Sequence, residues 1–97
     1  MRFSLIIASL LYLAVSPATI AGQTEYDDCI LEHLKGAKLD EATHLIKRAC
    51  DENYRNSGFT SDKTRNYNNC LLEHLVGVES VRAMLEIKTV CDRKHQR

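Results

Sequence analysis

The chain has 97 residues, with 13 basic and 13 acidic side chains and a formal net charge of zero. Without an excess of positive charge, the composition gives no reason to expect bulk attraction to nucleic acid or to an anionic membrane. A chain of this length buries only a small core and commonly needs cross-links, for which its four cysteines are candidates.

The N-terminus has the pattern of a secretory signal peptide. Arg2 precedes an apolar stretch at 3–15, and small residues follow up to a cleavage position after Ala21. The apolar stretch is shorter than the roughly 20 residues that a membrane-spanning helix needs. We therefore expect residues 1–21 to be removed, and residues 22–97 to be periplasmic or secreted, without membrane insertion.

A first helical hairpin is predicted at 25–53. Tyr26, Ile30 and Leu34 recur at the helical spacing and share one face. Gly36 follows at the place of the left-handed glycine that commonly ends a helix. The first helix of the hairpin is therefore expected to end there.

The second helix of this hairpin is predicted to begin at Asp40 and to carry Cys50 near its end. Its apolar residues recur at spacings of three and four; they are Ala42, Leu45, Ile46 and Ala49. The helix is expected to fray over residues 53–58. A polar linker at 54–63 follows, and its large apolar residue, Phe59, is predicted to plug the interface between hairpins.

The second half of the chain repeats the first. The stretch YDDCILEHLKG, which begins at Tyr26, recurs as YNNCLLEHLVG, which begins at Tyr67. Residues 26–51 align with 67–92 without a gap, and 12 of the 26 pairs are identical. Such a tandem repeat predicts two copies of one supersecondary unit, the second at 64–95.

The helix boundaries of the second copy follow from the same signals. Ser61 or Asp62 is the expected cap of its first helix, Gly77 ends that helix, and Ser80 caps the next. The inner face of the last helix is predicted to consist of Ala83, Ile87, Val90 and Cys91.

Four cysteines in an exported chain predict two disulfide bonds, with three possible connectivities. Each copy has one cysteine near the start of its first helix and one near the end of its second, and these ends adjoin in an antiparallel hairpin. This geometry favours Cys29–Cys50 and Cys70–Cys91, with pairing across the hairpins as the alternative. We predict an all-α fold in which two tandem disulfide-clipped helical hairpins form a small four-helix domain.

The run Cys-(Ile/Leu)-Leu-Glu-x-Leu-x-Gly, followed after a helix by x-Ala-Cys or x-Val-Cys, resembles a cysteine-bracketed α-hairpin of small exported bacterial proteins. The resemblance covers both copies. It implies an exported protein of helical hairpins, and it implies no activity.

The duplicated histidines His33 and His74 are the candidate metal ligands. Each histidine lies four residues after a cysteine, so the histidine and that cysteine share one face of the helix. With the second cysteine of the same hairpin, they could offer one imidazole and two thiolates to zinc or copper. Disulfide formation competes for the sulfurs, and a fourth protein ligand is missing from each copy. If the hairpins brought the two imidazoles together, they could instead bind a metal or haem iron.

The sequence does not predict an enzyme, since no nucleophile is paired with a base and no glycine loop suits a phosphate. We expect a protein-binding or accessory module without a cofactor, and the alternative is a small metal or haem carrier. Leu31, Leu72 and Leu85 are the candidate interaction surface, because four short helices cannot hide every apolar edge.

The charges of the two halves differ in sign. Residues 22–54 hold four basic and eight acidic side chains, whereas residues 55–97 hold eight basic and five acidic ones. The net charges of −4 and +3 have two interpretations. We favour two solvated faces that differ by drift, and the alternative is attraction between the halves, within one chain or head-to-tail between chains.

Overall fold

The computed structural model describes residues 22–97, so the predicted signal peptide lies outside the described residues. Over this range the chain forms four α-helices and no strand. The helices are α1 (Gln23–Leu34), α2 (Asp40–Cys50), α3 (Asp62–His74) and α4 (Val81–His95). Two short turns, η3 (Asp51–Arg55) and η4 (Ser57–Phe59), connect α2 to α3. The prediction of an all-α fold is confirmed.

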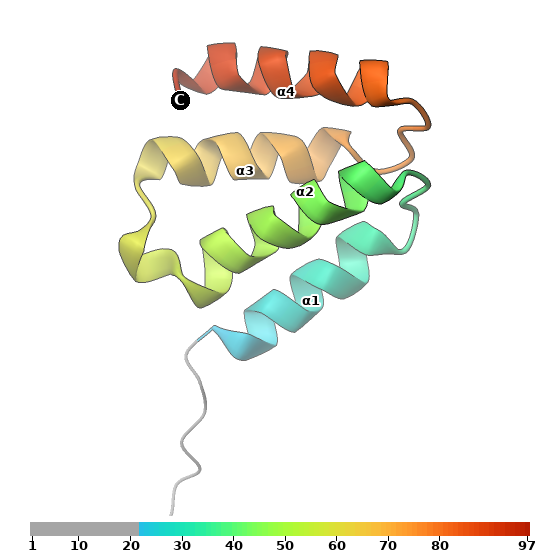
Figure 1. Ribbon diagram of the computed structural model, residues 1–97. Helices are drawn as coiled ribbons and strands as arrows, with labels where there is room; N and C mark the ends of the chain where they lie inside the picture. Colours follow the sequence, from blue (N-terminus) through green and yellow to red (C-terminus); the bar gives the residue numbers. More distant parts are fainter. Residues whose placement is uncertain (1–21) are drawn as a thin grey trace, which may run out of the picture.

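The helices lie side by side in chain order (Figure 1). α1 and α2 form one antiparallel hairpin, α3 and α4 form the other, and α2 packs on α3 to join them, with a smaller contact between α2 and α4. Because of this order, α2 and α3 are flanked on both sides, whereas α1 and α4 are the two ends of the row.

The core lies where α2 meets α3. Ile46 of α2 and Leu75, the residue that directly follows α3, are fully buried. Ala42 and Ala49 of α2 and Leu71 of α3 are buried with them, so the predicted inner face of α2 is confirmed at three of its four positions, and Leu45 packs against the core partly buried.

The predicted inner face of α4 is partly wrong. Cys91 is buried and Ile87 is partly buried, but Ala83 and Val90 are exposed, and Met84 is buried instead. The reason is the place of α4 in the row. Only one side of this helix faces other described helices, so a narrower stripe suffices to cover it.

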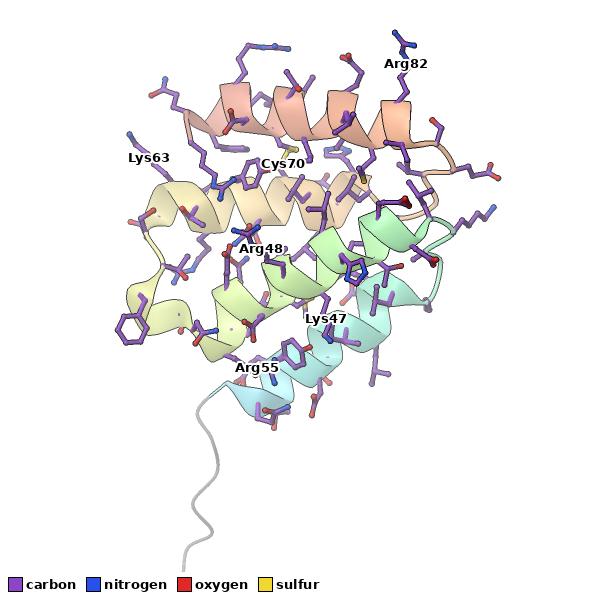
Figure 2. All side chains as sticks on the ribbon, viewed as in Figure 1. Lys47, Arg48, Arg55, Lys63, Cys70 and Arg82 are labelled. Carbon is purple, nitrogen blue, oxygen red and sulfur yellow. A yellow bond between two sulfur atoms is a disulfide. The ribbon has the colours of Figure 1, made fainter. Side chains whose placement is uncertain are left out.

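Each hairpin is closed by a disulfide bond, and both follow the local pairing favoured by the sequence. Cys29 is bonded to Cys50 and Cys70 to Cys91, with 5.8 Å between the Cα atoms in each pair. Figure 2 shows Cys70 on the side of α3 that faces α4. All four cysteine side chains are therefore used in linking α1 to α2 and α3 to α4.

The N-terminal caps of α3 and α4 are residues that the sequence predicts as caps. The Ser61 hydroxyl accepts a hydrogen bond from the Thr64 backbone N–H at 3.2 Å, and the Ser80 hydroxyl accepts one from Ala83 at 3.1 Å. Gly77 has a φ of 86°, in the left-handed region that favours glycine.

Gly36 does not adopt the predicted left-handed conformation, since Gly22 and Gly77 are the glycines with positive φ in the described range. A Cβ atom at position 36 would lie 3.0 Å from Cγ1 of Val76. The glycine therefore allows the loop of the first hairpin to approach the loop of the second.

The region after α2 does not fray as predicted. The chain continues into the π-helical turn η3, where the Asp51 carboxylate accepts hydrogen bonds from Arg55 at 2.7 Å and from Asn56 at 2.8 Å. Asn53 in this turn is buried. Phe59, which was expected to plug the hairpin interface, is instead 95% exposed.

A largely buried polar network fixes the packing of α3 on η3, the turn that follows α2. Asn68 donates to the side-chain oxygen of Asn53 at 2.9 Å and to the Glu52 carboxylate at 3.0 Å. Asn53 in turn donates to the side-chain oxygen of Asn69 at 2.9 Å. Buried amides are costly without partners, so this network selects one register between the hairpins.

Substitution of Asn68 by alanine is expected to lower the free energy of unfolding by about 1–3 kcal/mol, because Asn53 would keep a buried acceptor without its donor. Asn66 is exposed on the same helix, and Asn66→Ala is the matched control with an expected change near zero. Urea unfolding of the oxidised proteins measures both. Equal losses for the two variants would contradict the role of the network.

Candidate functional site

The groove between α3 and α4 is the first of two open apolar surfaces. It has a volume of about 410 Å³ and is lined by Cys70, His74, Glu86, Ile87, Val90, Cys91 and Lys94. The disulfide, Ile87 and Val90 supply its apolar part, while His74, Glu86 and Lys94 are exposed polar side chains. This α3–α4 groove can accept an apolar side chain and pair charges around it.

The groove is open because α4 ends the row of described helices. Its residues Ile87 and Val90 correspond, at the repeat offset of 41, to Ile46 and Ala49 of α2. Those two residues of α2 are buried, whereas Val90 is 38% exposed and Ile87 is partly buried. The second hairpin therefore presents a surface that the first hairpin uses for internal packing.

The second open surface lies on α1. The α1 face consists of Tyr26, Asp27, Ile30, Leu31, Leu34 and the adjoining Lys47 of α2. Arg55 lies over the Tyr26 ring, with 3.8 Å between the guanidinium carbon and the ring centroid, so Tyr26 is already covered. Leu31 is 71% exposed and is the most accessible apolar side chain of this face.

The three leucines predicted as an interaction surface do not lie together. Leu31 is exposed on the α1 face and Leu85 is half exposed on α4, at the other end of the row. The expectation that Leu72 is exposed is wrong, because Leu72 is 4% exposed in the core of α3. Leu31 and Leu72 are equivalent in the repeat, and they differ because α3 packs against α2 on that side while α1 is an end helix.

The two histidines lie on different helices with α2 between them (Figure 1). His33 is half-buried in the last turn of α1, and His74 is exposed in the α3–α4 groove. Within residues 22–97, no three His, Cys, Asp or Glu side chains are grouped so that they could hold a metal ion. Among the described residues, the structure therefore does not bring the two imidazoles together.

Sequence reasoning missed two features of the structure. The first is the exposure of Phe59, for which the only signal was the position of this large apolar residue in a polar segment. The polar network of Asn53 and Asn68 was hidden because asparagine is common in loops and at helix ends.

No described helix is both long enough and apolar enough to cross a membrane. Comparison with known proteins places residues 6–95 within the family described as four-cysteine protein VF_A0006-like. No curated protein and no solved structure matches the chain. The matched range contains both disulfide-clipped hairpins, and the chain belongs to this family of four-cysteine proteins.

Proposed function

We propose that this protein is an exported, non-enzymatic helical module that binds another protein in the periplasm or the extracellular space. Its export is supported by the signal-like N-terminal segment and by two disulfide bonds, which persist in oxidising compartments. The resemblance to small exported bacterial proteins with cysteine-bracketed hairpins supports the same location.

The observation that carries the binding role is the exposure of Leu31 within the α1 face. Ile30 and Leu34 lie beside it and are only partly buried, so an apolar strip runs along the outer side of α1. Contiguous apolar surface on a small protein commonly marks an interaction site. A partner covering this strip would bury leucine and isoleucine side chains at the centre of its interface.

Substitution of Leu31 by lysine is expected to weaken partner binding on the order of tenfold or more, because a charge would be placed in an apolar contact. Glu32→Lys is the matched control, since Glu32 is exposed on the same helix and outside the α1 face. Cross-linking in the exporting compartment, followed by quantification of each captured protein, measures the change, and circular dichroism checks the fold. Capture of every partner at the wild-type level by Leu31→Lys would overturn the proposal.

A further inference from the structure

The packing between the two hairpins is an interface with two distinct sides. A small cleft lies between these two sides. One side of it is lined by Tyr67, Asn68 and Leu71 of α3 and by Lys88 of α4; we refer to these four residues as the α3 side. The other side is lined by Leu45, Arg48 and Ala49 of α2 and by Glu52 of η3; we refer to these four residues as the α2 side. In Figure 2, Arg48 projects from α2 toward α3.

Each side of this interface has an unused equivalent elsewhere in the chain, at the offset of 41 residues. The equivalents of the α3 side are Tyr26, Asp27, Ile30 and Lys47, which all belong to the open α1 face. The equivalents of the α2 side are Glu86, Thr89, Val90 and Arg93, which are all exposed on α4. We refer to these four residues as the α4 face.

We propose that the α1 face of one copy packs on the α4 face of a second copy and thereby repeats the packing of the two hairpins within the chain. This inference rests on the proposed function, because it takes the α1 face as a protein-binding surface and names its partner. In a single chain the α4 face is exposed, and the α1 face is open except at Tyr26, which Arg55 covers just as Arg97 covers the equivalent Tyr67. Each face resembles one half of an interface that the chain already forms.

The charges at equivalent positions support this pairing. Within the chain, Asn68 donates to Glu52 and to Asn53. The equivalent of Asn68 is Asp27 on the α1 face, and the equivalents of Glu52 and Asn53 are Arg93 and Lys94 on α4. One amide that donates to a carboxylate and to a second amide is therefore replaced by a carboxylate that faces two cations.

The other end of the interface follows the same pattern. Lys88 and Leu45 both line the internal cleft, and their equivalents are Lys47 and Glu86. Asp28, the equivalent of Asn69, adds a second carboxylate on α1 near Arg93 and Lys94 of the neighbouring copy. The acidic first half and the basic second half of the chain thus meet in this arrangement, with net charges of −4 and +3.

Such an interface joins two different surfaces, so a row of copies has a free α1 face at one end and a free α4 face at the other. The row therefore either extends into a filament or closes into a ring, in which the two end faces meet. Because ion pairs between exposed groups are screened by salt, the association is expected to weaken as the ionic strength rises.

The test uses purified oxidised protein comprising residues 22–97, studied by sedimentation velocity over a range of concentrations at low and high salt. Leu31→Lys disables the α1 face and Val90→Lys disables the α4 face, so each variant alone is expected to be monomeric. An equimolar mixture is expected to form a dimer, because each variant keeps the intact face that the other has lost. Recovery in the mixture also shows that both variants are folded.

A charge reversal gives an independent check. Asp27→Arg or Arg93→Glu alone is expected to weaken self-association about tenfold, and the double variant is expected to recover it. A wild-type protein that stays monomeric at all concentrations would overturn the head-to-tail proposal. Dimerisation of Val90→Lys alone would overturn it too, since that result indicates a symmetric contact between α1 faces. If a monomeric wild type still captures another protein through Leu31, the proposed function survives and only the identity of the partner is wrong.

Discussion

Replacing Ile46 by alanine is expected to lower the free energy of unfolding by about 2–5 kcal/mol. Ile46 has no exposed surface and lies in the core between the hairpins, so truncation leaves a cavity that the clipped helices cannot easily close. Small domains have little stability to lose, and a change of this size is a large fraction of the total.

The repeat provides a control of identical chemistry. Ile87 is the equivalent residue of the second hairpin, but it is only partly buried beside the open α3–α4 groove. Ile87→Ala is therefore expected to cost roughly half as much or less. Urea unfolding at low protein concentration and high salt, where self-association is suppressed, compares the two variants. Equal losses would contradict the difference in burial between the two faces.

Removal of either disulfide is expected to cost about 3 kcal/mol, because each bond closes a loop of similar length between cysteines 21 positions apart. The pairs Cys29→Ala with Cys50→Ala, and Cys70→Ala with Cys91→Ala, are compared with wild type by thermal and urea unfolding. Loss of both bonds, by reduction or by substitution of all four cysteines, is expected to cost about 6 kcal/mol.

The sum of the two losses is comparable to the whole stability of many small domains. The reduced protein is therefore expected to lose most of its fixed tertiary structure at room temperature, with a drop in the helical circular dichroism signal. A reduced protein that unfolds at the same urea concentration as the oxidised one would show that the clips do not stabilise the hairpins.

The secondary structure and the disulfide pairing could be predicted because both depend on local spacing. Helical periodicity predicts the four helices, and the cysteines near the open end of each hairpin predict the two disulfide pairs. The caps Ser61 and Ser80 were predictable for the same reason, since a capping side chain bonds to an N–H three residues later.

The exposed surfaces could not be predicted in this way, because they depend on which helices pack side by side. Leu31 and Leu72 occupy the same place in the repeat, yet one is exposed and the other is buried. Gly36 and Gly77 are also equivalent, but only Gly77 has a positive φ, while Gly36 lies close to Val76 of the other hairpin. A duplicated sequence predicts two equal hairpins. In the row of helices, however, α1 and α4 lie at the ends and α2 and α3 in the middle, so equivalent residues have different neighbours.

The central claim, that this chain is an exported module held by disulfides rather than a carrier of metal, is tested most directly by intact mass spectrometry. The protein is purified from the exporting compartment and weighed under native and denaturing conditions, with thiols counted. We expect the mass of residues 22–97 less four hydrogen atoms, one pair for each of the Cys29–Cys50 and Cys70–Cys91 bonds, with no bound metal. A chain that retains residues 1–21, or one with four free thiols and stoichiometric zinc or copper, would contradict this account.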